Sequence, residues 1–225
     1  MPIDRTDVLT ALQSQGVCPV FYHSDPEVAL NVIRACARGG APVTEFTNRG
    51  DFAVDLFADI ARELARTEPE VMLGIGSVLD AGTAAMYLNR TARFVVSPAL
   101  VAEVAVVCNR RRVAYFPGCG SVRDITEAHA LGVDIVKLFP GASVGGPDFV
   151  KAVMGPMPWT KIMPTGGVDP DAASIAKWFG AGIVAAGMGS KLITDAAVKA
   201  GDWAGIEASV RGAVDAVAAF RSSKP

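Results

Sequence analysis

The stretch Asp134-Ile135-Val136-Lys137-Leu138-Phe139-Pro140-Gly141 indicates a buried β-strand that carries a lysine in its middle and stops at a proline–glycine turn. Side chains alternate along a strand, so Lys137 shares one face with Ile135 and Phe139. Burying an unpaired ammonium group is costly, and burial favours the neutral, nucleophilic amine. The lysine could instead be paired with a carboxylate for structural reasons or protect an edge strand. Lys137 is therefore a candidate catalytic lysine.

Short β-branched runs alternate with helical patterns along the whole chain and give eight strand–helix pairs in 225 residues. This alternation predicts an α/β protein with a parallel sheet, and eight unbroken units favour a closed (β/α)8 TIM barrel over an open sheet. We expect one domain, residues 1–225, with an amino-terminal helix, Thr6–Gln15, that caps the bottom of the barrel. We expect the tail after Arg221 to fray.

The expected strands are Val17–Tyr22, Val43–Thr47, Val71–Leu73, Phe94–Ser97, Val113–Phe116, the lysine strand, Thr160–Pro164 and Ile183–Gly187. The expected helices between them are one opened by Asp25-Pro26 that ends near Gly39-Gly40, then Phe52–Arg66, one after Asp80, Leu100–Asn109, Ser121–Leu131, Asp148–Met154 and Asp169–Phe179. A helical segment follows the last strand.

Composition excludes several classes of protein. The net charge of −2 offers no basic footprint for nucleic acid, and no basic amphipathic helix suggests a membrane surface. No apolar run approaches the roughly 20 residues of a membrane span, and the amino terminus lacks the apolar core of a signal peptide. The four cysteines are far apart and there are only two histidines, so we expect no metal site. We expect a cytoplasmic protein with reduced thiols.

A barrel of this kind places its chemistry at the carboxyl ends of the strands. Alternation puts Glu45 on one face of the second strand with Val43 and Thr47. If that face is the interior, Glu45 and Lys137 point into the same cavity. A buried ion pair without chemical duty is the plain alternative, but such pairs seldom stabilise better than apolar packing. Arg49, just beyond this strand, could bind a substrate carboxylate through two hydrogen bonds, or could be an ordinary surface arginine.

Glycine-rich loops are expected after strands three, five, seven and eight. They are Gly74-Ile75-Gly76-Ser77, Pro117-Gly118-Cys119-Gly120, Thr165-Gly166-Gly167 and Gly187-Met188-Gly189-Ser190. Phosphate sites in such barrels often use the loops after strands seven and eight, whose backbone N–H groups can approach an anion closely. Glycines at loop corners can also be purely conformational. Two such loops at this place in the series favour a phosphate site over purely conformational glycines. No Walker or dinucleotide fingerprint is present.

These residues together resemble the class I 2-keto-3-deoxy-6-phosphogluconate (KDPG) and 4-hydroxy-2-oxoglutarate (KHG) aldolases. The resemblance rests on six segments that occur in the family's order over nearly the whole chain. They are Thr44–Arg49, Gly74–Leu79, Val95–Pro98, Val136–Pro140, Met163–Val168 and Gly187–Ser190. The family implies a (β/α)8 barrel, a homotrimer, a keto sugar acid and pyruvate as ligands, and no cofactor or metal.

The resemblance also implies roles for individual residues. Lys137 would form a Schiff base with the substrate C2 ketone, and Glu45 would move protons. Arg49 would hold the pyruvyl carboxylate. The remaining substrate-binding residues would be Ser77, Thr165, Gly166, Gly167, Gly189 and Ser190, with Gly166, Gly167 and Ser190 around a distal phosphate.

The sequence departs from the family pattern at four places. Ser77 stands where threonine is more common, and Thr47-Asn48-Arg49-Gly50 replaces a Thr-Leu-Arg-Thr run. Phe21-Tyr22-His23 replaces an aliphatic end of strand one, and Cys119-Gly120 replaces residues such as isoleucine-serine. Two other functions remain open on the same barrel: a phosphosugar isomerase or epimerase with Glu45 and Lys137 as acid and base, and a non-catalytic sugar-phosphate binder. Neither would form an imine.

Overall fold

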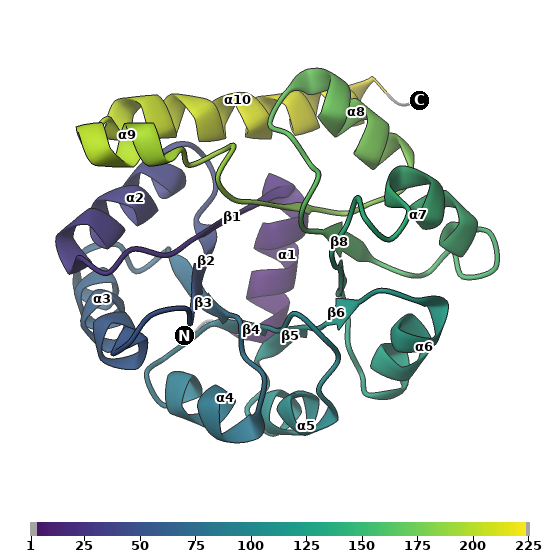
Figure 1. Ribbon diagram of the computed structural model, residues 1–225, viewed down its shortest axis with the longest axis horizontal. Helices are drawn as coiled ribbons and strands as arrows, with labels where there is room; N and C mark the ends of the chain where they lie inside the picture. Colours follow the sequence, from purple (N-terminus) through teal and green to yellow (C-terminus); the bar gives the residue numbers. More distant parts are fainter. Residues whose placement is uncertain (1–3, 224–225) are drawn as a thin grey trace.

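The computed structural model describes residues 4–223 and shows parallel strands surrounded by helices (Figure 1). The strands are β1 (Val17–Phe21), β2 (Val43–Thr47), β3 (Met72–Gly76), β4 (Phe94–Val96), β5 (Ala114–Phe116), β6 (Gly118–Cys119), β7 (Val136–Leu138), β8 (Ile162–Pro164) and β9 (Ala186–Met188). The helices are α1 (Arg5–Gln15), α2 (Pro26–Arg38), α3 (Ala53–Thr67), α4 (Ala81–Leu88), α5 (Ala102–Arg110), α6 (Val122–Ala130), α7 (Gly146–Met154), α8 (Ala172–Gly180), α9 (Asp195–Ala200) and α10 (Trp203–Ser222). Within residues 4–223, no helix is long and apolar enough to cross a membrane.

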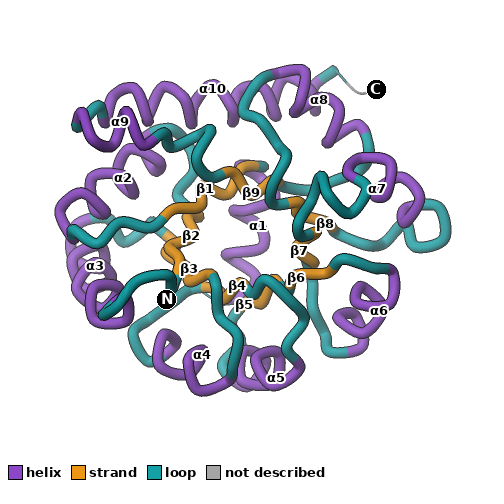
Figure 2. Tube along the Cα trace, in the orientation of Figure 1, coloured by secondary structure: helices purple, strands orange, loops and turns teal. Residues whose placement is uncertain are grey.

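The strands form two parallel sheets that curl around a common centre, with α2–α10 outside them and α1 at the centre of the view (Figure 2). One sheet has the order β5-β4-β3-β2-β1-β9, and the other has the order β6-β7-β8. A β-bridge between Thr165 and Gly187 joins β8 to β9, and the Val184 N–H donates a hydrogen bond of 3.0 Å to the Ile162 carbonyl beside it. The expected α/β class and parallel sheet are confirmed.

Two sequence expectations are wrong in detail. The expected loop Pro117-Gly118-Cys119-Gly120 contains a further short strand, β6, and Pro117 separates it from β5 because a proline has no N–H to donate to a sheet ladder. The third strand runs on to Gly76 instead of ending at Leu73, because Gly74 and Gly76 pair with Glu45 and Thr47 of β2. The carboxy-terminal segment is two helices, which Gly201 separates in a left-handed conformation. Of the tail after Arg221, Ser222 still belongs to α10 and Ser223 caps it, whereas residues 224 and 225 lie outside the described residues.

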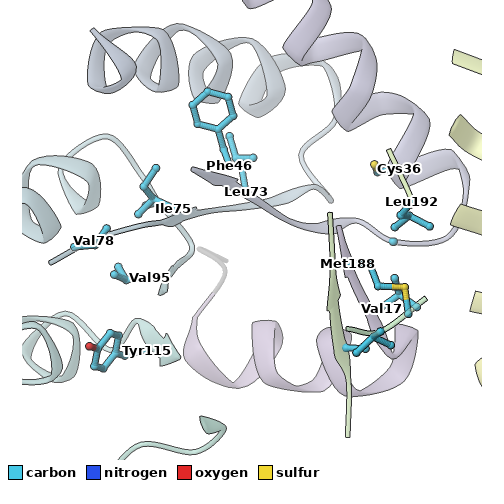
Figure 3. Packing of buried hydrophobic residues seen from close by; sticks show 14 of the residues in the cluster. Val17, Cys36, Phe46, Leu73, Ile75, Val78, Val95, Tyr115, Met188 and Leu192 are labelled. Carbon is cyan, nitrogen blue, oxygen red and sulfur yellow. The ribbon is translucent and has the colours of Figure 1, made fainter. Parts of the chain in front are cut away.

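Alternation along the strands separates the core into two layers. Val136 and Leu138 belong to the outer cluster between strands and helices, which Figure 3 shows around Phe46. Ile135, by contrast, belongs to an inner cluster enclosed by the strands, as does Val43 of β2. The faces predicted for the second and the lysine strands are therefore confirmed, and Glu45 and Lys137 both lie on the inner face.

Helix α1 lies against the amino-terminal ends of several strands. Its Val8 and Leu12 pack into the inner cluster. The Gln15 amide nitrogen donates to the carbonyls of Val17 (2.6 Å) and Val43 (2.9 Å), and its oxygen accepts from the Val43 N–H. The opposite, carboxyl ends of the strands are left free for a binding site.

Candidate active site

Glu45 and Lys137 come from β2 and β7, which lie across the ring of strands from each other (Figure 2). The side chain of Glu45 is 1% exposed and that of Lys137 6% exposed. Burial raises the pKa of the Glu45 carboxyl, and the positive charges of Lys137 and Arg49 offset part of this rise. A buried carboxyl with a raised pKa can exchange protons near neutral pH.

The two buried groups influence each other electrostatically without forming a salt bridge. No ion pair of 4.0 Å or less includes Lys137 among residues 4–223; its ammonium lies 5.0 Å from the centre of the Phe139 ring. Glu45 Oε2 is buried and has no hydrogen-bond partner within the described chain. A structural ion pair therefore does not account for the buried lysine.

Gly76 makes room for the Glu45 carboxylate. A Cβ atom at residue 76 would overlap Glu45 Oε1, and a Cβ at Gly74 would overlap the Phe94 ring. These glycines therefore serve close packing inside a strand, where a side chain would displace its neighbour.

Arg49 and Ser77 meet at the carboxyl ends of β2 and β3. The Arg49 Nε–H donates a hydrogen bond of 3.4 Å to Ser77 Oγ. Ser77 has a φ of 63°, in the left-handed region, where a residue other than glycine is strained; such residues cluster at functional sites. The Tyr87 hydroxyl holds the neighbouring Asn48 side chain through a 2.8 Å hydrogen bond to Oδ1.

A cavity of 560 Å³ opens at the carboxyl ends of the strands. The expected residues that line it are Arg49, Thr165, Gly166, Gly167, Gly189 and Ser190. Ser77 does not line the cavity but contacts Arg49, while Glu45 and Lys137 are buried and do not line it either. Phe139 connects the two regions, since its ring lines the cavity and contacts the Lys137 ammonium.

Buried hydroxyl groups add to the polar character of this end. Thr47 Oγ1 and Thr165 Oγ1 are buried, and neither has a hydrogen-bond partner within residues 4–223. Gly187 accommodates Thr165, because a Cβ at residue 187 would overlap the threonine hydroxyl. Unpartnered buried polar atoms are uncommon in proteins, and their presence here with Glu45 Oε2 indicates a site for a polar ligand.

The structure adds residues that were not among the sequence candidates. They are Tyr22, Asp169 and Lys191, which line the cavity. Asp169 and Lys191 lie one or two residues beyond the two glycine loops, and that position could have pointed to them. No three His, Cys, Asp or Glu side chains gather as metal ligands within the described chain.

The model of the family described as KDPG and KHG aldolase matches residues 8–209. The chain belongs to this family. It is 32% identical over 191 residues to the 2-dehydro-3-deoxy-phosphogluconate aldolase of Pseudoalteromonas atlantica, covering 84% of this chain and 86% of that protein. It is 29% identical over 211 residues to the KHG/KDPG aldolase of Escherichia coli K12, and the match covers 94% of this chain and 96% of that protein.

A solved structure brings the comparison to the chemistry. The KDPG aldolase of Legionella pneumophila, with pyruvate captured at low pH as a covalent carbinolamine intermediate, superposes with a TM-score of 0.82. It is 27% identical, and the match covers 92% of this chain and 97% of that one. The Legionella pneumophila aldolase therefore forms a covalent bond with pyruvate.

Proposed function

We propose that the protein is a Schiff-base aldolase, an aldehyde-lyase of class I. It reversibly cleaves 2-keto-3-deoxy-6-phosphogluconate, or a related 2-keto-3-deoxy sugar acid or 4-hydroxy-2-oxoglutarate, to pyruvate and an aldehyde. The aldehyde is glyceraldehyde 3-phosphate for the phosphorylated sugar acid and glyoxylate for 4-hydroxy-2-oxoglutarate. The observation that carries the proposal is the buried Lys137 on the inner face with Glu45, without a salt bridge, in a chain of this family.

The chemistry begins with loss of a proton from the Lys137 ammonium and attack of Nζ on the C2 carbonyl. The carbinolamine then loses water and becomes a protonated imine. A base removes the C4 hydroxyl proton, the C3–C4 bond breaks, and its electron pair moves toward the imine nitrogen to give an enamine and the free aldehyde. Protonation at C3 and hydrolysis release pyruvate and regenerate Lys137. Glu45 carries the protons in these steps, because its raised pKa lets it both accept and donate them.

The remaining residues position the substrate. Arg49 holds the pyruvyl carboxylate, and Ser77 orients its guanidinium through the 3.4 Å hydrogen bond. Thr165 contacts the substrate through its unpartnered hydroxyl. Backbone N–H groups of the loops after β8 and β9 receive the distal end of the sugar acid at Gly166, Gly167, Gly189 and Ser190.

We also propose that the two sheets act as one closed (β/α)8 barrel in a single domain, residues 1–225, with α1 as its bottom cap. The bridge between Thr165 and Gly187, the continuity of β5 and β6 through Pro117, and the contacts of Gln15 support this. The homotrimer that the resemblance implies and the cytoplasmic location stay predictions; sedimentation velocity would check the first.

Reduction with borohydride in the presence of pyruvate is expected to add one reduced pyruvyl group, located by peptide mapping at Lys137. An isomerase or epimerase that uses Glu45 and Lys137 as acid and base forms no imine, so it would not be trapped. Neither would a non-catalytic binder. A folded protein that gains no adduct, or gains it at another lysine, would contradict the aldolase proposal.

Replacing Gly50 by alanine is expected to lower kcat/KM for the sugar acid about tenfold, because a shift of the cavity wall misplaces the substrate. A Cβ at residue 50 would overlap the Tyr22 hydroxyl, and the Tyr22 ring already packs 5.4 Å from the Phe46 ring centre. Steady-state kinetics would measure the loss. The added Cβ would also overlap Cζ of the Tyr22 ring, so the rescuing variant has to remove the ring as well as the hydroxyl. Gly50→Ala should therefore cost little when it is added to Tyr22→Leu; an equal loss from Gly50→Ala in both backgrounds would speak against this contact.

A further inference from the structure

An ion pair lies on the wall of the cavity beside the two glycine loops. The Lys191 ammonium is 2.6 Å from Oδ1 and 2.7 Å from Oδ2 of Asp169, so it contacts both carboxylate oxygens. Asp169 follows the Gly166-Gly167 turn by two residues, and Lys191 directly follows Ser190. Both line the cavity. The pair thus lies where the distal end of the sugar acid is expected.

The backbone holds both partners in place. The Asp169 N–H donates a hydrogen bond of 3.0 Å to Ser174 Oγ at the start of α8. The Trp178 indole N–H donates a hydrogen bond of 3.1 Å to the Gly167 carbonyl and so holds the Gly166-Gly167 turn, which precedes Asp169. On the other loop, the N–H groups of Leu192 and Ile193 both donate to the Gly189 carbonyl, and both side chains are buried. Two ordered loops therefore present the pair to the cavity.

The pair also sets the charge of this part of the cavity. The side chains of Lys191 and Asp169 are 66% and 36% exposed, so a ligand can reach both. Their charges cancel, and the other charged residues on the wall are Arg49 and Asp195. A phosphate at the distal end would be attracted by Lys191 and repelled by Asp169. A neutral hydroxyl end would feel little of either charge.

We propose that the Asp169–Lys191 pair determines how strongly the site prefers a phosphorylated aldehyde over its unphosphorylated counterpart. Lys191 donates to the distal phosphate, and Asp169 holds the ammonium beside the loops while limiting its attraction for the anion. The inference rests on the proposed aldolase function and adds two specificity residues to it. The competing explanation is a surface ion pair without influence on substrate choice.

The test compares condensation of pyruvate with glyceraldehyde 3-phosphate and with D-glyceraldehyde, through the ratio of the two kcat/KM values. Asp169→Asn removes the repelling charge and is expected to raise the ratio about threefold, whereas Lys191→Met should lower it about tenfold, as expected for one charge near a partly solvated anion. The double variant should lie between the two single variants. Raising the ionic strength should shrink these differences, because salt screens exposed charges.

The matched controls come from a second exposed pair. Lys151 and Asp148 on α7 are 3.8 Å apart and do not line the cavity. Lys151→Met changes the net charge as Lys191→Met does, and Asp148→Asn changes it as Asp169→Asn does. Both control variants should leave the ratio of the two kcat/KM values unchanged. Ratios within twofold of the unmodified protein for both Asp169→Asn and Lys191→Met, or shifts in the opposite direction, would overturn the inference. Borohydride trapping of pyruvate in the unmodified protein tests the aldolase function separately.

Discussion

Replacing Lys137 by methionine is expected to lower aldol cleavage by at least about 10⁴-fold, because no other group can form the imine that accepts the electron pair. Methionine keeps most of the buried stem of the lysine and removes the ammonium. Borohydride trapping with pyruvate should disappear in the same variant. Both effects are measured by cleavage kinetics and by intact-protein mass.

The variant should fold at least as well as the unmodified protein. Lys137 is 6% exposed and has no salt bridge within the described residues, so its charge is buried without full compensation. Thermal unfolding should therefore show an unchanged or higher midpoint, which separates lost chemistry from lost structure. Lys161→Met, at an exposed lysine just before β8, is the matched control and should retain both trapping and turnover. An adduct that persists in Lys137→Met would disprove the assignment.

Replacing Glu45 by glutamine is expected to slow proton transfer by about 10²- to 10⁴-fold, the usual contribution of a general acid–base group. Glutamine has nearly the same shape but cannot carry the proton. Exchange of the pyruvate methyl protons in deuterated water, followed by NMR, measures this step without any aldehyde. Glu103→Gln, on the exposed face of α5, is the control and should exchange at the normal rate.

The pH dependence provides a second readout for Glu45. Burial raises its pKa, so the carboxylate is lost at a higher pH than for an ordinary glutamate. As pH falls through the raised pKa, the exchange rate should fall, and Glu45→Gln should lack this acid limb. Ionisation of the buried carboxyl opposes folding. The free energy of unfolding should therefore decrease, relative to Glu45→Gln, as pH rises from about 4.3 through the raised pKa. If the exchange rate of Glu45→Gln still fell at low pH, the fall in rate would have to come from the titration of another group.

The sequence by itself determined which residues of two strands share a face, and the structure showed that this face turns inward. The period of two places Glu45 with Val43 and Lys137 with Ile135, and the structure keeps both arrangements. Local signals also gave the helix starts at Asp25 and Asp80, where the side-chain oxygen accepts backbone N–H groups. Such features depend on neighbours in the chain, so they can be predicted without the fold.

Glycine was the least reliable signal. Gly74 and Gly76 indicated a loop, yet they lie in β3, because their lack of a side chain admits the Phe94 ring and the Glu45 carboxylate. Gly118 likewise lies in a strand, where a Cβ would overlap the Pro98 carbonyl. A glycine needed for a turn and one needed for close packing look the same in a sequence, since only the neighbour across the sheet distinguishes them.

Only the tertiary structure decided which side chains meet one another in the walls of the cavity. Tyr22 fills the space left by Gly50, and Lys191 pairs with Asp169, although the members of each pair are more than 20 residues apart. The sequence by itself determined the strand faces and the two residues proposed for catalysis, through alternation within single strands. The partners across the cavity required the curl of the sheet, because contacts between separate strands and loops follow from packing in three dimensions.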